Sequence, residues 1–404
     1  MRIRYGTSPW IHEFPDSRRP AHPRFRGERT ADVVIIGGGL TGCATAYACA
    51  VAGARPVIIE ADRVGSGRTG RSAGLLLPDP GPAFRDIVAV HGLRVARRAF
   101  SSWRRASLDA AAMIRRLGIK AALESCDALT LARGDDKPLH RECDARAEAG
   151  LDARWLNPRQ ARQLALVETA GAIRTGDTFT VDPYRVCLGV AAAAVKRGAT
   201  MFERTAVNKV RVARAHVEVI TDGGVIRADR VVVATGSATP EFTPLRRHFK
   251  RRHSYFTLTE VVPAAIRKQL FPHGLVLRDA AASPHAMCWT RDDRLLVSGS
   301  DQDELPARQR DAALVQRTGE LMYELLKTYP VISGLMPQYG WDLTYGVTAD
   351  GLPYIGAHRN YPRHLFALGG GRDSLTGAFL AARILARAVT GDSDKADEVF
   401  GFTR

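Results

Sequence analysis

The chain has 404 residues, of which 45% are hydrophobic and 25% are charged. This length and balance are typical of a globular protein with two closely joined domains, and they exclude a disordered chain or a single small core. Lys and Arg outnumber Asp and Glu by 58 to 42, a formal net charge of +16, but the arginines are spread along the whole chain without interleaved aromatic residues. The charge therefore does not favour nucleic acid as a partner and suits the attraction of anionic substrates.

Cysteine usage and hydropathy exclude further classes of protein. The six cysteines are scattered, with no C-x-x-C pair and no spacing typical of a metal site, so we expect free thiols in a reducing cytoplasm and no bound metal. The longest apolar run, Val186 to Val195, is shorter than the roughly 20 residues that span a bilayer. The sequence therefore predicts a soluble cytoplasmic protein with no membrane partner.

The first 30 residues are rich in Arg and Pro and carry isolated apolar side chains, among them Trp10 and Phe14. They show no helical or strand periodicity. We predict an extended arm that these two aromatic side chains hold against the body of the protein.

Residues 31–60 have the order of elements found at a dinucleotide site. Val33 to Ile36 is a short β-branched run typical of a central parallel strand. The G-x-G-x-x-G sequence at 37–42 permits a tight turn, close approach of a pyrophosphate and close packing of the next helix. Small residues from Ala44 to Ala52 form that helix, and its free N–H groups would face the phosphates.

A second short strand, Pro56 to Ile59, ends at Glu60. This carboxylate follows the glycines by about 20 residues, where it would accept hydrogen bonds from ribose hydroxyls. An acid at this position does not suit a 2′-phosphate, so the sequence predicts FAD or NAD rather than NADP.

The acid is followed by a second glycine-rich segment, Gly65 to Gly74. Its hydroxyl side chains, Ser66, Thr69 and Ser72, and its backbone N–H groups suit it to line a cofactor. The apolar run Leu75 to Leu77 then predicts that the chain enters the interior of the protein.

These segments resemble the FAD-dependent oxidoreductases of the D-amino-acid oxidase superfamily, which includes glycine oxidase, sarcosine oxidase and γ-glutamylputrescine oxidase. The resemblance rests on Ile35 to Gly42, on Glu60-Ala61 and on Gly70-Arg71-Ser72-Ala73-Gly74. Many relatives read G-R-N-G-G or G-R-N-A-G in the last segment and pass it over the flavin, and here Ser72 stands where they have Asn. The resemblance spans residues 30–404.

The next part of the chain is interpreted as an inserted second domain. Leu93 to Leu117 has apolar residues at helical spacing, and Asp127 to Ala132 is typical of a strand. Helices are predicted over Pro138 to Leu164, with a break at Asn157-Pro158.

The dinucleotide fold is expected to resume near Thr180 to Pro183, with a helix over Tyr184 to Arg197. The strands predicted next are Thr200–Phe202, Val207–Val212, His216–Ile220 and Val225–Arg227, with a hairpin turn before the last. The following strand ends in Ala234-Thr235-Gly236, which is similar to a second element of the superfamily that lies near the cofactor.

Residues 242–337 resemble the antiparallel sheet that forms the substrate cavity over the flavin in this superfamily. Ser254 to Thr259 alternates polar and apolar residues, and Ala286 to Thr290 pairs with Arg294 to Ser300 as a predicted hairpin. A helix is expected over Leu314 to Leu326.

A third glycine-rich turn, Gly369 to Ser374, lies between a predicted strand and a helix over Ala378 to Thr390. Backbone N–H groups and the positive end of the helix dipole again point at one spot. In relatives this spot is the pyrimidine end of the flavin, and many of them read G-x-G-G-N-G-x-T where this chain has Arg372, Asp373 and Ser374.

The predicted fold is α/β (α+β overall): a Rossmann-like FAD-binding domain with a parallel sheet, joined to a substrate domain with an antiparallel sheet. We assign residues 1–30 to the N-terminal arm, 31–92, 177–241 and 338–404 to the discontinuous FAD-binding domain, and 93–176 and 242–337 to the substrate domain.

The residues expected to contact FAD come from the three glycine-bearing turns and the strand ends beside them. They are Gly37, Gly38, Gly39, Leu40, Thr41, Gly42, Glu60, Ala61, Ser66, Gly67, Thr69, Gly70, Arg71, Ser72, Ala73, Val207, Ala234, Thr235, Gly236, Gly356, Gly371, Arg372, Asp373, Ser374, Leu375 and Thr376. No cysteine lies in the segment from Thr348 to Gly356 and no histidine in the second glycine-rich segment, so we expect non-covalent FAD.

A substrate carboxylate needs an Arg or Lys partner. Arg71, Arg252 and Arg372 are candidates because they flank the flavin-side loops, and Tyr255 in the substrate sheet could bind a carboxylate or an amine. We take Arg71, Tyr255 and Arg372 as the predicted catalytic residues.

The sequence thus predicts the FAD-dependent oxidation of a small amine or amino acid, by hydride transfer to flavin N5 and hydrolysis of the resulting imine. O2 is a candidate electron acceptor, so oxidase and dehydrogenase are both open. Two alternatives remain. An NAD-linked dehydrogenase would leave the second and third glycine turns without a role, and a basic flavoprotein acting on tRNA would bind nucleic acid in a strongly salt-dependent way. The oligomeric state is not specified.

Overall fold

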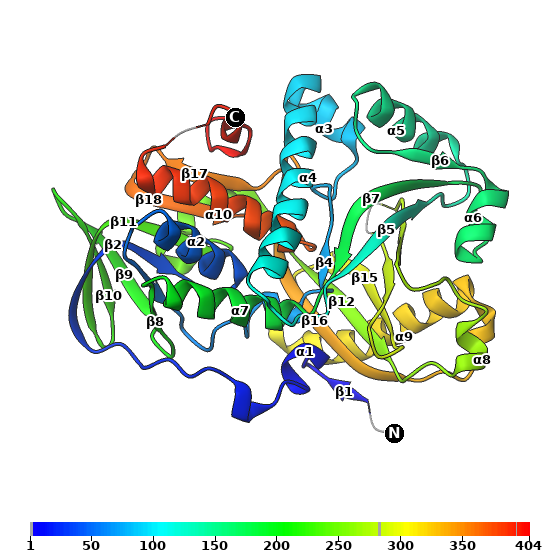
Figure 1. The fold of residues 1–404 in the computed structure, drawn as a ribbon, viewed down its shortest axis with the longest axis horizontal. Coiled ribbons are helices and arrows are strands. Elements are labelled where there is room, and N and C mark those ends of the chain that lie inside the picture. Colours follow the sequence, from blue (N-terminus) through cyan, green and yellow to red (C-terminus); the bar gives the residue numbers. More distant parts are fainter. Residues whose placement is uncertain (1–2, 282–283, 393) are drawn as a thin grey trace.

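The protein is described by a computed structural model that covers residues 3–281, 284–392 and 394–404. In these residues the strands form two sheets that lie side by side, with helices packed against both (Figure 1). One sheet is mainly parallel and the other mainly antiparallel, which confirms the predicted fold class.

The first sheet contains the strands predicted around the glycine turns. Its strands are β2 (Gly27–Ile36), β3 (Pro56–Ile59), β8 (Thr200–Phe202), β9 (Val207–Val212), β10 (Val217–Thr221), β11 (Gly224–Gly236), β17 (Tyr354–His358) and β18 (Tyr361–Leu368). The order is β17-β18-β11-β2-β3-β8, and every neighbouring pair from β18 to β8 is parallel. β9 and β10 extend β11 into an antiparallel meander.

Helices α2 (Leu40–Val51), α7 (Pro183–Lys196) and α10 (Leu375–Thr390) lie together beside this sheet (Figure 1). Helix α2 consists largely of small residues, so nearly all of its length is buried between α7 and α10. Its first turn needs Gly42, because a Cβ there would lie 1.9 Å from the carbonyl oxygen of Gly37. The small side chains therefore bring the helix N-terminus close to the end of β2.

The second sheet has the order β1-β16-β12-β15-β14-β13-β5-β7-β4, with β6 paired to β7. The bounds are β1 Arg4–Tyr5, β4 Leu75–Leu76, β5 Glu124–Leu131, β6 Arg154–Leu156, β7 Ala172–Thr180, β12 Phe249–Thr259, β13 Leu275–Asp279, β14 Ala286–Trp289, β15 Leu295–Asp303 and β16 Pro337–Thr348. The predicted hairpin forms as β14 and β15. The pairs β1 with β16 and β5 with β13 are parallel, and the others are antiparallel.

The two faces of the second sheet pack against different elements. Helix α9 (Ala307–Thr328) covers one face, where Leu321 joins a core with Tyr255 and Val297. On the other face, the stacked rings of Phe256 and Trp341 pack with the apolar end of the second glycine-rich segment. The remaining helices are α1 (Pro9–His12), α3 (Phe84–His91), α4 (Leu93–Arg116), α5 (Lys137–Glu148), α6 (Pro158–Ala165) and α8 (Ala264–Arg267).

Several segments differ from the predicted layout. Residues 338–348, which the sequence assigned to the FAD-binding domain, lie in β16 of the second sheet. Helix α4, assigned to the substrate domain, packs against α10, where Trp103 lies over Gly377. The helical stretch predicted before Asn157 is interrupted by β6, because Asn157 caps α6 and the residues before it are extended.

The N-terminal arm packs against the body, as its aromatic residues indicated, but it is not extended throughout. Strand β1 pairs with β16, and α1 lies on the second glycine-rich segment. Trp10 Nε1 donates a hydrogen bond to the Ser72 carbonyl oxygen at 3.0 Å. The arm therefore supports the back of a predicted cofactor loop.

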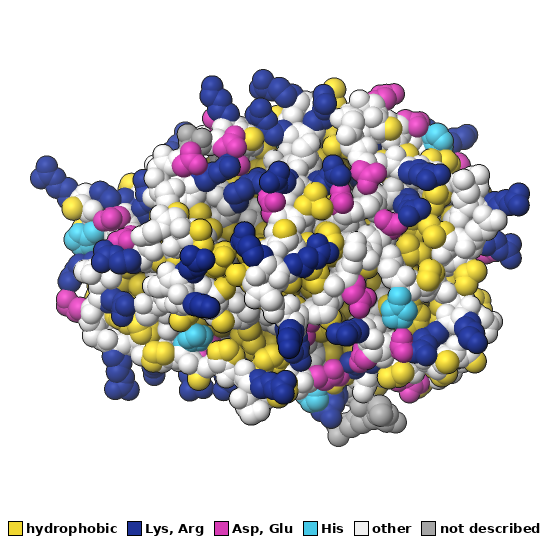
Figure 2. Space-filling view, in the orientation of Figure 1, with side chains coloured by type: hydrophobic (Ala, Val, Ile, Leu, Met, Phe, Trp, Pro, Cys, Tyr) yellow, Lys and Arg dark blue, Asp and Glu magenta, His cyan; other side chains and the backbone are white. Residues whose placement is uncertain are grey.

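Within the described residues no helix combines the length and the apolar character needed to cross a membrane. All six cysteines are buried and unpaired. On the face shown in Figure 2, Lys and Arg side chains are scattered among neutral and acidic ones and form no continuous stripe.

Candidate functional site

A cavity of about 270 Å³ lies where the glycine-bearing turns meet. Its wall includes residues from the first turn, from the second glycine-rich segment, from the end of β11 and from the third turn. The predicted cofactor residues on this wall are Gly37, Gly39, Leu40, Thr41, Glu60, Ala61, Gly67, Thr69, Ser72, Val207, Ala234, Thr235, Gly236, Arg372, Ser374 and Leu375. Residues as far apart in the sequence as Gly37 and Leu375, which are 338 positions apart, therefore line one space.

The first turn is shaped by close backbone contacts. Gly37 has a φ of +110°, and a Cβ there would lie 2.8 Å from the carbonyl oxygen of Ala234. No side chain caps the N-terminus of α2 at Gly39, while Thr69 Oγ1 accepts the N–H of Leu40 at 3.0 Å. The next N–H groups of this turn, at Thr41 and Gly42, have no side-chain acceptor among the described residues, and they suit a phosphate.

Glu60 lies at the end of β3 and on the cavity wall. Its Oε2 accepts the N–H of Gly38 at 2.6 Å, and its Oε1 accepts the N–H of Asp62 at 2.8 Å. Burial raises the pKa of Glu60, and these two N–H donors partly oppose the rise. Each oxygen keeps a lone pair that can accept a ribose hydroxyl.

Other predicted cofactor residues lie outside this wall, in supporting positions. Gly38 donates its N–H to Glu60, Gly42 permits the close packing of α2, and the Thr376 hydroxyl donates to the Leu77 carbonyl oxygen at 2.9 Å. Gly371 and Asp373 line an adjoining cavity. Ser66, Gly70, Arg71, Ala73 and Gly356 line neither of the two cavities.

Arg68 is a wall residue that the sequence analysis did not single out, although it lies inside the second glycine-rich segment. Its Nη2 donates to the Gly371 carbonyl oxygen at 2.7 Å and lies 3.4 Å from Ser374 Oγ, and a Cβ on Gly236 would be 2.4 Å from its Nη1. Its Nε is sealed from solvent without a hydrogen-bond partner. Burial lowers the pKa of Arg68 to about 10.

No carboxylate in the described part of the chain forms an ion pair with Arg68. A guanidinium held in a cavity without a counter-ion is unfavourable unless a bound anion compensates it. The other wall residues missed from sequence, Ile36, Ile59, Gly65, Thr205 and Ala378, are apolar or backbone contacts with no sequence signature of their own.

The cavity residues fit FAD. Glu60 supplies acceptors for ribose hydroxyls, and the uncapped start of α2 and the uncompensated Arg68 supply positive charge for a pyrophosphate. Glycines at 37 and 42 remove the side chains that would close the turn.

A second cavity of about 490 Å³ adjoins the first, and Arg372 lines both. It lies between the second sheet, the third glycine turn and helix α5. Charged side chains and one tyrosine hydroxyl lie on its wall among apolar residues such as Leu77, Leu139 and Ile173: Asp79, Asp86, Glu142, Arg146, Arg252, Arg278, Asp279, Asp301, Tyr345, Arg372 and Asp373. This mixed composition suits a ligand that carries both apolar and charged groups.

Arg372 is buried between two carboxylates where the cavities meet. Its Nε and Nη2 each donate to Asp373 Oδ2 at 3.1 Å, and its Nη1 lies 3.4 Å from Asp301 Oδ1. Burial opposes the charged form, but Asp373 and Asp301 more than offset it and raise the pKa of Arg372. The Tyr345 hydroxyl donates to Asp301 Oδ2 at 2.5 Å, and Arg252 Nη2 donates to the Asp301 backbone carbonyl oxygen at 3.1 Å, so acidic and basic side chains lie together beside the third glycine turn.

The two other predicted catalytic residues lie elsewhere. Arg71 lies 3.6 Å from Asp342 Oδ1, and Tyr255 is 2% exposed in the core under α9, where its hydroxyl accepts a hydrogen bond from Gln302. Neither is among the described residues that line the two cavities. Tyr255 faces away because side chains alternate along β12, and Arg252, three residues earlier, is the one on the cavity wall.

Known proteins are similar to this chain in sequence and in fold. The family of FAD dependent oxidoreductases (DAO) matches residues 32–388. The γ-glutamylputrescine oxidoreductase of Escherichia coli K12 is 26% identical over 385 residues, 91% of this chain and 85% of that protein. The glycine oxidase of Bacillus licheniformis is 25% identical over 390 residues, 92% and 96% of the two chains.

Among solved structures, glycine oxidase from Geobacillus kaustophilus aligns with a TM-score of 0.77 at 21% identity and covers 93% of this chain and 99% of that one. This likeness confirms the shared fold. Because the family match extends over most of the sequence and the cavity residues suit the cofactor, the chain belongs to the DAO family of FAD-dependent oxidoreductases.

Proposed function

We propose that this protein oxidises a small amine or amino acid at its C–N bond, with non-covalent FAD as the immediate electron acceptor. The observation that carries the proposal is that the cofactor cavity and a polar second cavity adjoin at Arg372. The names of the glycine oxidase and γ-glutamylputrescine oxidoreductase relatives support an amine substrate.

Bound flavin supplies the hydride acceptor at N5, and the oxidised substrate is an imine that water hydrolyses. The chain's own residues hold the cofactor and the substrate. Glu60 binds ribose hydroxyls, and Arg68 with the start of α2 neutralises the pyrophosphate. The N-terminus of α10, at Ser374, places a positive dipole end beside the same space.

The carboxylates of Asp301 and Asp373 lie on the wall of the second cavity, which adjoins the cofactor cavity at Arg372. An amine enters mostly as an ammonium ion, and a carboxylate there attracts it by charge-assisted hydrogen bonds. The amine must release a proton before its C–H bond can be oxidised.

Attachment of FAD without a covalent bond is supported by the composition of both walls. Neither cysteine nor histidine is found among the described residues that line the two cavities. FAD should therefore be released by acid precipitation of the protein.

The test is an anaerobic substrate screen on FAD-reconstituted protein, with loss of visible flavin absorption as the readout. We expect primary or secondary amines or amino acids to reduce the flavin. A protein that binds FAD but is reduced by none of them would refute the amine assignment and leave the cofactor assignment standing. Reoxidation by O2 after reduction then distinguishes an oxidase from a dehydrogenase.

A further inference from the structure

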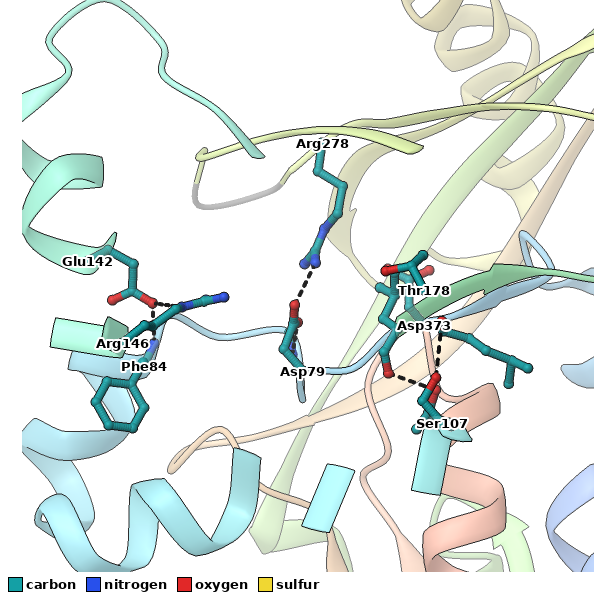
Figure 3. A network of polar contacts seen from close by, with 12 residues as sticks. Asp79, Phe84, Ser107, Glu142, Arg146, Thr178, Arg278 and Asp373 are labelled. Atoms are coloured by element: carbon teal, nitrogen blue, oxygen red, sulfur yellow. Dashed lines mark hydrogen bonds and ion pairs between the residues drawn. The ribbon is translucent and has the colours of Figure 1, made fainter. Parts of the chain in front are cut away.

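The part of the second cavity next to helix α5 holds four charged side chains, Asp79, Glu142, Arg146 and Arg278. All are nearly buried: the side-chain exposure is 6% for Asp79 and 9% for Arg278, and 7% for Glu142 and 12% for Arg146. Figure 3 shows Glu142 and Asp373 on opposite sides of Asp79. These four residues therefore form a second polar site away from the third glycine turn.

The carboxylates of this quartet already have their hydrogen-bond donors. Asp79 accepts from Arg278 Nη1 at 2.9 Å and from a loop N–H at 3.0 Å, one on each oxygen. Glu142 accepts from Arg146 Nε at 2.6 Å and from two backbone N–H groups at the start of α3, at 2.7 and 3.1 Å. No oxygen of either carboxylate lacks a donor.

The guanidinium groups, in contrast, have donors to spare. Each carries five N–H bonds, but within the described residues Arg278 donates one hydrogen bond, to Asp79, and Arg146 donates one, to Glu142. Among the described residues, none of their other nitrogen atoms is sealed from solvent without a partner, and both side chains line the second cavity. The Arg146 guanidinium also lies 5.2 Å from the centre of the Phe100 ring. Both guanidinium groups point toward Asp79 in Figure 3.

Both arginines act on the same carboxylate. Burial alone would raise the pKa of Asp79, but Arg278 and Arg146 hold that pKa below its usual value. The quartet pairs two arginines with two carboxylates and has more unused N–H donors than unused acceptors. A neutral site with surplus N–H groups is suited to a ligand group that only accepts hydrogen bonds.

We propose that Arg146 and Arg278 bind a carboxylate of the substrate, while the amine to be oxidised lies beside the third glycine turn. The proposal rests on the function proposed above and narrows its substrate class to amines that carry a carboxylate several bonds away from the reacting nitrogen. It moves the carboxylate-binding role from Arg71, Arg252 and Arg372, the candidates named from the sequence, to two arginines with unused donors.

The first test compares substrates on the FAD-reconstituted full chain. The probes are 5-aminopentanoate, its methyl ester and pentylamine, which share the amine and differ at the distal end. A charge-assisted carboxylate contact predicts that kcat/KM for the acid exceeds that for pentylamine by about 10- to 100-fold. We expect most of this difference in kcat/KM to come from a lower KM for the acid. Equal values for the three probes would overturn the proposal, and a preference for the ester would indicate an amide-like or ester-like ligand instead.

The second test uses a charge-balanced variant, Asp79→Asn with Arg278→Met, because removal of the arginine alone leaves a buried carboxylate unpaired. The matched control is Asp127→Asn with Arg174→Met, an ion-paired Asp and Arg on the same sheet that line neither cavity. The acid-to-amine preference should fall to within about threefold in the first variant and persist in the control. Retention of the preference in the first variant would refute the assignment.

Binding of glutarate, measured by isothermal titration calorimetry, separates this inference from the proposed function. Glutarate should bind the wild type and the control, and bind the cavity variant at least tenfold more weakly. If no amine reduces the flavin but glutarate binding follows this pattern, the function fails and the carboxylate site stands. If amines reduce the flavin but glutarate does not bind the wild type, the carboxylate site fails and the function stands.

Discussion

Replacement of Arg68 by Met tests the electrostatic role of the second glycine-rich segment. Met keeps most of the aliphatic volume and removes the charge. Arg68 lines the cofactor cavity, its Nε has no partner, and its hydrogen bonds are to neutral oxygens of Gly371 and Ser374. We therefore expect the guanidinium to be the cation that compensates the cofactor's phosphates.

The magnitude follows from the two states of the protein. In the apoprotein, the loss of the hydrogen bonds to the Gly371 carbonyl and the Ser374 hydroxyl costs about 1–2 kcal/mol, and relief of a poorly compensated charge offsets part of this. The lowered pKa of Arg68 reports that unfavourable environment. In the holoprotein, a charge-assisted contact worth about 1.5–3 kcal/mol is lost, which corresponds to about 10- to 150-fold weaker FAD binding.

The assay is titration of apoprotein with FAD, followed by flavin fluorescence, together with thermal unfolding with and without FAD. Arg63→Met is the matched control, because Arg63 belongs to the same loop and is outside both cavity walls. Arg68→Met should reduce the stabilisation by FAD while the melting temperature of the apoprotein changes little. If Arg68→Met binds FAD as tightly as the Arg63→Met control, the electrostatic reasoning is refuted.

Three further predictions concern stability. Gly42→Ala places a Cβ 1.9 Å from a backbone oxygen and should lower the free energy of unfolding, measured in urea, by about 1–3 kcal/mol. The control is Gly319→Ala in α9, whose Cβ meets no atom within 4 Å and should not destabilise the protein. Burial raises the pKa of Glu60, so the Glu60 carboxyl holds its proton more tightly in the native apoprotein than in the unfolded chain. The stability of the wild type relative to Glu60→Gln should therefore fall as pH rises above the usual Glu pKa. Arg404 donates to Asp350 at 2.7 and 3.0 Å, and Arg404→Met should cost about 2–4 kcal/mol in chemical denaturation.

Each of these predictions has a clear opposing result. An alanine at position 42 that leaves both stability and FAD affinity unchanged would mean that the first turn is not limited by backbone contact. If the difference in unfolding free energy between the wild type and Glu60→Gln does not change with pH, the effect of burial on the pKa of Glu60 is excluded. The ion pair of Arg404 with Asp350 also predicts how stability changes in acid. Burial would raise the pKa of Asp350, but its contacts with Arg404 lower that pKa. The stability that the pair contributes should be lost only as pH falls through the lowered pKa, and Arg404→Met should abolish this pH-dependent loss.

The first glycine turn could be predicted because all of its information is local. The strand β2, the glycines, helix α2, the strand β3 and Glu60 follow one another within 34 residues, and each has its own pattern of residues. The hairpin of β14 and β15 and the helix α2 could be predicted for the same reason, because residues close together in the sequence form their contacts.

The local sequence pattern, then, determined a dinucleotide site, because that site depends on short-range order and on the backbone freedom of glycine, and the resemblance to the D-amino-acid oxidase superfamily implied FAD and the antiparallel substrate domain. The tertiary structure decided which charged groups meet. Arg68 and Gly371 are 303 residues apart, and Arg278 and Asp79 are 199 residues apart, so their contact depends on how the two sheets pack. The tertiary structure also decided the places of Tyr255 and Arg252. Side chains alternate between the two faces of a strand, and only the packing of one face against α9 determines that the other face lines the cavity.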